Sequence, residues 1–207
     1  ESLFSMEGTT APIKEISKLC IEYDSKLLID EAHAFGVMGS AGRGESFELK
    51  EPISIISGTF GKAFGSGGAF LATDKITGKN LIQNCGAFRY TTALAPPLCA
   101  SALAALNLIE SNPNWGSELK EKSKALRDRL SQVGWQRPAG EGPIISIILG
   151  SDRLAMDYQE RLEAQGLLTV AIRPPTVPEG KSRLRLVIRR NTPVQAFERL
   201  IEVLKNK

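Results

Sequence analysis

Residues 53–68 read Ile53-Ser54-Ile55-Ile56-Ser57-Gly58-Thr59-Phe60-Gly61-Lys62-Ala63-Phe64-Gly65-Ser66-Gly67-Gly68, an apolar run that leads into glycines around a single lysine. The β-branched residues of the run predict a strand, and the glycines let the following backbone turn sharply and approach a ligand closely. Backbone N–H groups in such a loop suit a phosphate. A lysine held there becomes a nucleophile when positive charge or desolvation lowers its pKa. A glycine-rich turn with a solvated lysine is the simpler explanation of this loop alone.

Support for a functional loop comes from an upstream run that ends in acidic and imidazole groups. This run reads Lys26-Leu27-Leu28-Ile29-Asp30-Glu31-Ala32-His33 and contains the only histidine of the chain. A buried strand here delivers Asp30 and His33 to its carboxyl end, where open α/β sheets bind ligands. A lone histidine after a strand is more often structural. A carboxylate, an imidazole and a lysine on adjacent strand ends nevertheless match pyridoxal 5'-phosphate (PLP), which needs a protonated pyridine nitrogen and a Schiff-base lysine.

The order of predicted elements indicates an α/β fold with two domains. Residues 2–5 predict a short strand, residues 12–23 a helix and residues 27–30 a strand, and this βαβ order favours a mostly parallel sheet. The best linker lies at residues 112–116, which are rich in Asn, Pro and Gly. We therefore expect a large domain at residues 1–111 and a small α+β domain, with its linking helix, at residues 112–207.

The small domain is predicted from strands at residues 144–149, 168–172 and 183–188 and a helix at residues 152–165. A final amphipathic helix opens at Thr192-Pro193. Helical spacing predicts that its core-facing residues are Phe197, Leu200, Ile201 and Leu204.

Composition excludes several other classes of protein. The 207 residues carry a net charge of +3 without a long run of like charges, which does not favour nucleic acid or a membrane surface as a partner. Three cysteines without a Cys-x-x-Cys pair predict reduced thiols rather than disulfides or a zinc site. With no signal-peptide pattern, we expect a cytoplasmic protein without a metal.

Four stretches together carry a resemblance to a known family. They are Glu1-Ser2-Leu3-Phe4-Ser5-Met6-Glu7-Gly8, Asp30-Glu31-Ala32-His33, Thr59-Phe60-Gly61-Lys62 and Arg173-Pro174-Pro175-Thr176-Val177-Pro178. In order and spacing they resemble the α-oxoamine synthases, PLP enzymes of fold type I. The resemblance corresponds to the C-terminal portion, roughly the latter half, of such an enzyme. It implies part of the PLP-binding large domain followed by the small C-terminal domain.

The resemblance assigns cofactor roles residue by residue. It implies that Lys62 forms the Schiff base, that Asp30 partners the pyridine nitrogen and that His33 lies beside the phenolic oxygen. Ser5 and Thr59 match positions that contact the cofactor. Thr91 or Thr92 resembles a threonine that reaches the phosphate of the other subunit's cofactor, which implies a homodimer with shared sites.

The resemblance also implies substrate positions in the small domain. Thr176 matches a substrate-binding position, and Arg173 faces the acyl donor. Arg183 and Arg185 lie two apart and therefore share one face of a strand, with Leu184 on the other. Their alternation alone is typical of a solvated strand face. Family placement favours Arg185 as the ligand of the substrate carboxylate, which a guanidinium binds with a bidentate fork, and leaves Arg183 as the solvated member.

The implied reaction is the decarboxylative C-acylation of an amino acid by a CoA or acyl-carrier-protein thioester. The Arg173-Pro174-Pro175 form favours the branch of the family that condenses L-alanine with a pimeloyl thioester to 8-amino-7-oxononanoate in biotin synthesis. The alternatives are glycine C-acetyltransferase activity and a non-catalytic, dimerising module. Family members carry, ahead of the region that matches Glu1, segments that stack on the cofactor ring, bind its phosphate and line the acyl site. The last alternative follows because these 207 residues do not include those segments.

Overall fold

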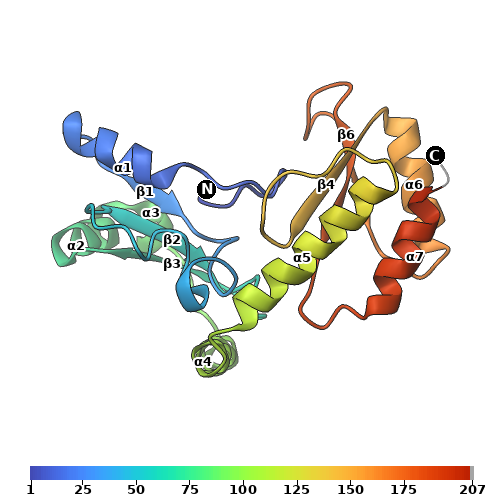
Figure 1. Cartoon of the computed structure of the whole chain (residues 1–207). Helices are drawn as coiled ribbons and strands as arrows, with labels where there is room; N and C mark the ends of the chain where they lie inside the picture. Colours follow the sequence, from blue (N-terminus) through green and yellow to red (C-terminus); the bar gives the residue numbers. More distant parts are fainter. Residues whose placement is uncertain (206–207) are drawn as a thin grey trace. The chain divides into compact units, whose positions relative to one another are not determined.

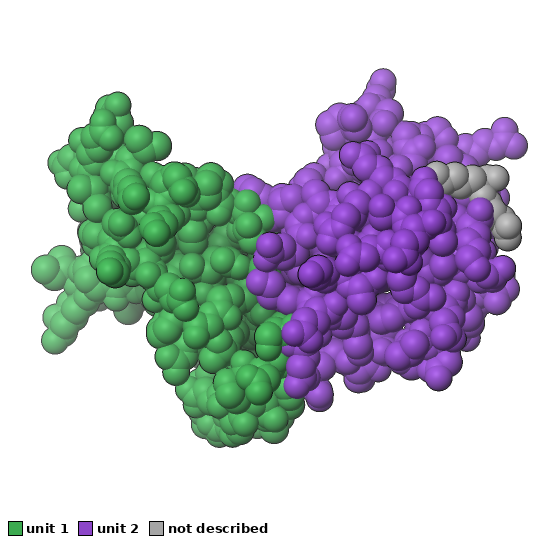
Figure 2. Space-filling model, viewed as in Figure 1, with its two compact units in different colours: residues 1–3, 10–117 green, residues 4–9, 118–207 purple. Residues whose placement is uncertain are grey.

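The computed structural model describes residues 1–205, which fold into two compact units (Figure 2). The first unit consists of residues 1–3 and 10–117. The second consists of residues 4–9 and the chain from Glu118 onward. A short N-terminal segment, residues 4–9, thus belongs to the second unit although the first unit supplies the residues on both sides of it. The domain boundary expected between residues 111 and 112 stays a prediction.

The first unit is built on a three-stranded sheet in the order β1-β2-β3 (Figure 1). The strands are β1 (Leu28–Asp30), β2 (Ile55–Thr59) and β3 (Ala69–Thr73). Strand β1 runs parallel to β2, and β3 runs antiparallel to it. The α/β class is confirmed, and the sheet is mixed. The lysine loop is the direct β2–β3 connection, and a connection this short can join only antiparallel neighbours.

Five helices accompany this sheet among the described residues. They are α1 (Ile13–Glu22), the 3₁₀ turn η1 (Ser40–Gly42), α2 (Lys75–Asn84), α3 (Gly86–Arg89) and α4 (Pro96–Ser111). Asp74 caps α2 by accepting hydrogen bonds from the backbone N–H groups of Ile76 and Thr77. The hydrogen bonds with Thr77 lower the pKa of Asp74 below its usual value.

The strand expected at residues 2–5 is wrong. Leu3 forms a single antiparallel bridge with Thr10, and the Ser2 N–H donates to the carbonyl oxygen of Asp30 at 2.9 Å. The chain then closes a tight turn, in which Phe4 N–H donates to Thr9 and Gly8 N–H donates to Phe4. This turn ends the extended backbone after Leu3, so no strand can propagate.

The second unit is a three-stranded antiparallel sheet with helices. Its elements are α5 (Trp115–Gln132), β4 (Ile144–Gly150), α6 (Asp152–Glu163), β5 (Val170–Ile172), β6 (Ser182–Val187) and α7 (Val194–Lys205). The first three residues of α5 belong to the first unit. The sheet order is β4-β6-β5. All four residues predicted to face inward from the last helix are buried, and Leu204 is completely so. This prediction is confirmed, because burial of a single apolar stripe is what stabilises an amphipathic helix.

Arg127 of α5 is completely buried and holds the chain before β4. Its guanidinium donates hydrogen bonds to the carbonyl oxygens of Ala139, Gly142 and Ile144 at 2.8–3.2 Å. Burial lowers the pKa of Arg127 to about 10, because an apolar interior disfavours the charged form. None of the helices of residues 1–205 combines the length and apolar character needed to cross a bilayer.

Candidate functional site

Four of the residues expected to hold the cofactor, Asp30, His33, Thr59 and Lys62, gather at the ends of β1 and β2. Asp30 is the last residue of β1 and stands opposite Ser57 in the parallel register. Lys62 follows the end of β2 by three residues, and His33 follows the end of β1 by three. Because parallel strands end at the same edge of a sheet, both loops leave from that edge. Ligands of open α/β sheets bind at this position.

The Asp30 carboxylate is held in place from both sides. One oxygen accepts a hydrogen bond from the Ala32 N–H at 2.8 Å, and the other accepts one from the Ser57 hydroxyl at 3.1 Å. His33 is half-buried, with its Nε2 3.9 Å from a carboxylate oxygen of Glu1. The two hydrogen bonds from Ala32 and Ser57 give the Asp30 carboxylate a defined orientation. A carboxylate needs such an orientation to act as the partner of a ring nitrogen.

Lys62 lies in an ordered loop, residues 60–68, that Thr59 closes. The Thr59 hydroxyl donates to the Gly68 carbonyl at 3.0 Å and accepts from the Gly61 N–H at 3.1 Å. Phe60 N–H donates to the same carbonyl of Gly68 at 2.9 Å. The lysine itself is exposed. Thr59 therefore has a defined structural role at the base of the lysine loop.

Two residues of this site were not identified from the sequence. One is Ser57, the hydrogen-bond partner of Asp30; the available signal was a hydroxyl directly after the apolar run that precedes the lysine loop. The other is Glu31, which is completely buried. Its carboxylate accepts hydrogen bonds from the Ser2 hydroxyl at 2.6 Å and from the N–H groups of Glu45 and Ser46. Glu31 thereby fixes the chain between Asp30 and His33.

The remaining expected site residues belong to other segments of the chain. Thr91 and Thr92 are exposed in the segment between α3 and α4. Ser5 belongs to the second unit, together with the expected substrate residues Arg173, Thr176 and Arg185. Thr176 N–H donates to the carbonyl oxygen of Arg173 at 3.1 Å, and both side chains are exposed. The structure thus brings Asp30, His33, Thr59 and Lys62 to one sheet edge.

The prediction that Arg183 is solvated is wrong. Arg183 is only 5 % exposed, and its Nη1 forms an ion pair with Glu7 at 3.0 Å. Arg185 is half-buried, and its Nε donates to the carbonyl oxygen of Ser5 at 2.6 Å. Leu184, which lies on the other face of the strand from Arg183 and Arg185, is completely buried, as the alternation predicts. The 4–9 segment covers the arginine face that the alternating pattern indicated to be open.

A cavity of about 500 Å³ in the first unit is lined mainly by apolar side chains, including Phe35, Phe60, Phe64 and Phe70. A side chain added at Gly58 would meet the rings of Phe70 and Phe35. Gly58 and Ser57 face opposite sides of β2. These rings therefore lie on the face of the sheet away from the Asp30–Ser57 hydrogen bond.

Comparison with known proteins identifies the family. The family model described as aminotransferase class I and II matches residues 1–204. The chain belongs to the aminotransferase class I and II family. This finding agrees with the strand-end arrangement of Asp30 and Lys62 described above.

Individual relatives within this family show more closely which proteins the chain resembles. The 8-amino-7-oxononanoate synthase of Lysinibacillus sphaericus is 36 % identical over 207 residues, which are 99 % of this chain and 53 % of that protein. The solved 8-amino-7-oxononanoate synthase of Francisella tularensis has a TM-score of 0.85 at 27 % identity, covering 99 % of this chain and 60 % of the other. A solved structure of SPT with PLP reaches 0.91 at 25 % identity, with 99 % and 52 % covered.

These relatives confirm the resemblance predicted from the four motifs and the partial fold-type-I architecture. The chain spans about half the length of the curated relatives it matches. PLP, the cofactor expected from the sequence, is also the group named with the solved SPT structure.

Proposed function

We propose that this chain carries the lysine, the aspartate and the substrate arginine of a PLP-dependent C-acyltransferase. The proposed reaction joins L-alanine to a pimeloyl thioester and gives 8-amino-7-oxononanoate, carbon dioxide and the free thiol. The observation that carries it is the position of Asp30 and Lys62 at the same end of neighbouring parallel strands. The family match and the names of the relatives support the same activity.

The donor set at the strand ends fits PLP chemically. A carboxylate, an imidazole and a primary amine lie on two adjacent loops, and Ser57 and Ala32 fix the carboxylate. When bound, PLP supplies an electron sink that stabilises negative charge at the α-carbon of an amino acid. In this proposal Asp30 holds a proton on the pyridine nitrogen, and Lys62 holds the aldehyde carbon.

The other residues of the chain orient the reactants. His33 would donate a hydrogen bond to the phenolic oxygen. Once the amino group of L-alanine has displaced Lys62 from the aldehyde carbon, the freed Nζ of Lys62 would remove the proton from the α-carbon of the substrate. Arg185 binds the amino-acid carboxylate through its guanidinium. Thr176 and Arg173 contact the substrates, and Ser5 and Thr59 support the cofactor. Thr91 or Thr92 contacts the phosphate of the cofactor in the second subunit of a homodimer, and the proposed location is the cytoplasm.

Binding of PLP to Lys62 tests this proposal directly. Purified protein mixed with PLP should develop a visible absorbance band, and borohydride reduction should leave the label on the peptide that contains Lys62. Lys62→Ala should abolish both signals, whereas Lys79→Ala, in the exposed face of α2, should leave both intact. Absence of label on wild-type Lys62 would refute the proposal and favour a non-catalytic, dimerising module.

The choice of substrates is tested by turnover. L-Alanine with a pimeloyl thioester should be converted faster than glycine with acetyl-CoA. The opposite preference would assign the chain to the glycine C-acetyltransferase branch. Only the sequence at residues 173–178 separates the two branches, since both share nearly all of the cofactor residues.

A further inference from the structure

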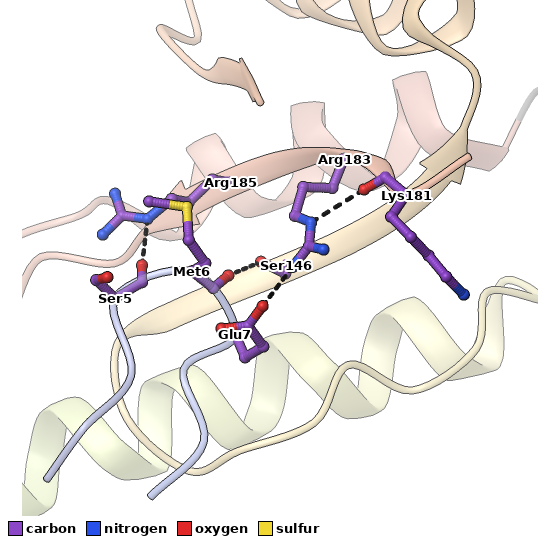
Figure 3. A network of polar contacts seen from close by, with 7 residues as sticks. All are labelled: Ser5, Met6, Glu7, Ser146, Lys181, Arg183 and Arg185. Atoms are coloured by element: carbon purple, nitrogen blue, oxygen red, sulfur yellow. Dashed lines mark hydrogen bonds and ion pairs between the residues drawn. The ribbon is translucent and has the colours of Figure 1, made fainter. Parts of the chain in front are cut away.

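One face of β6 is organised around the 4–9 segment (Figure 3). Arg183 and Arg185 alternate with Leu184 and therefore project from the same face of the strand. The side chains of both contact residues of the 4–9 segment. Glu7 and Arg183 are 176 residues apart in the chain, so this contact exists only in the folded protein.

The Arg183 guanidinium holds the 4–9 segment through the carboxylate of Glu7. Its Nη1 binds the Glu7 carboxylate at 3.0 Å, and its Nε donates to the Lys181 carbonyl at 3.1 Å. The Arg183 side chain is 6 % exposed, whereas that of Glu7 is 52 % exposed. A buried guanidinium needs such a partner, because an unpaired buried charge is costly.

Hydrogen bonds close the backbone of the 4–9 segment at its two ends and hold it in the middle. Phe4 N–H donates to the Thr9 carbonyl, and Gly8 N–H donates to the Phe4 carbonyl, at 2.8 and 2.9 Å. In the middle, the Ser146 hydroxyl of β4 donates to the Met6 carbonyl. Fixing Glu7 therefore also fixes the carbonyl oxygen of Ser5, two residues away.

That carbonyl oxygen determines the orientation of Arg185. Arg185 donates through Nε to Ser5 at 2.6 Å. A guanidinium is planar and rigid, so an Nε contact fixes the direction of the edge that bears Nη1 and Nη2. This edge is the one that binds a carboxylate with two parallel hydrogen bonds.

We propose that Glu7 and Arg183 are positioning residues for substrate binding: their ion pair holds the 4–9 segment so that the Ser5 carbonyl orients Arg185 for the amino-acid carboxylate. The inference rests on the proposed function, in which Arg185 binds that carboxylate. Neither Glu7 nor Arg183 touches the substrate. Their effect reaches it through Ser5 and Arg185.

The test uses the PLP-loaded protein and the variants Glu7→Gln and Glu7→Asp. Glu7→Gln should raise the KM for L-alanine about five- to ten-fold, because misorientation weakens a binding contact. The kcat and the KM for the acyl thioester should stay within about two-fold of wild type. Glu7→Asp keeps the charge and should recover part of the loss. Glu202→Gln, which removes the carboxylate of an exposed ion pair with Lys205 on α7, is the matched control and should change neither KM.

A double-variant comparison separates positioning from general stabilisation. In an Arg185→Lys background the fork is absent, so adding Glu7→Gln should not raise the L-alanine KM further. The thermal shift that L-alanine induces in each protein gives a second measure of binding that does not depend on turnover.

Three outcomes overturn the inference. The first is an unchanged L-alanine KM in Glu7→Gln, with only a lower unfolding temperature; this indicates a purely structural ion pair and leaves the proposed function standing. The second is a further rise in KM when Glu7→Gln is added to Arg185→Lys. The third is a wild-type protein that neither binds nor converts L-alanine, which overturns the proposed function as well.

Discussion

Replacing Gly8 with alanine tests how closely the 4–9 segment packs on β4. Gly8 has a φ of +71°, a conformation that residues with a Cβ rarely adopt. A Cβ at this position would also lie under 3.0 Å from the carbonyl oxygen of Ile144, closer than Cβ atoms come to other atoms. Gly180 is the matched control, because its φ is +72° and a Cβ added there would have no atom within 4 Å.

The two variants differ only in whether the added Cβ collides with another atom. The positive φ costs both of them about 1–2 kcal/mol. Only in Gly8→Ala must the 4–9 segment move away from Ile144, and this breaks the Ser146–Met6 hydrogen bond and loosens the Glu7–Arg183 ion pair. We assign about 1 kcal/mol to the hydrogen bond. The ion pair, with one partner buried and one half exposed, adds about 1–2 kcal/mol.

Gly8→Ala should therefore lower the free energy of unfolding by about 2–3 kcal/mol more than Gly180→Ala does. Urea unfolding of the two variants and wild type, followed by near-ultraviolet circular dichroism, measures this difference. Equal losses in the two variants would refute the reasoning, since they would mean that the 4–9 segment accommodates a methyl group without leaving β4.

Three further substitutions test other buried contacts. Arg127→Met leaves three carbonyl groups of residues 139–144 without donors but also removes a buried charge, so we expect a net destabilisation of about 2–4 kcal/mol and faster proteolysis of that segment. Glu31→Gln weakens the acceptor for the N–H of Ser46 and should accelerate amide hydrogen exchange at Ser46, whereas unchanged exchange would contradict the role of Glu31. Leu204→Ala should cost about 2–5 kcal/mol. Leu168→Ala, at a side chain that is 89 % exposed, should stay within about 0.5 kcal/mol of wild type in the same thermal unfolding experiment.

Local sequence pattern determined several features of this protein. The apolar runs before Asp30 and Ser57 contribute to strands β1 and β2, and helical spacing identified the buried face of α7. The placement of Asp30 and Lys62 at one sheet edge also followed from the sequence. Neighbouring parallel strands end at the same edge of a sheet, so a residue at the end of one strand and a residue just beyond the end of the other lie at that edge whatever surrounds them.

Only the tertiary structure determined what covers each face of a strand. The alternation of Arg183 with Leu184 determined that they face opposite ways, yet it carried no information that Glu7 would bury the arginine. The expected strand at residues 2–5 failed for a related reason, because the turn at residues 4–9 ends the extended backbone after Leu3. Periodicity records the geometry of one chain segment, whereas burial and pairing depend on partners that folding brings from distant positions.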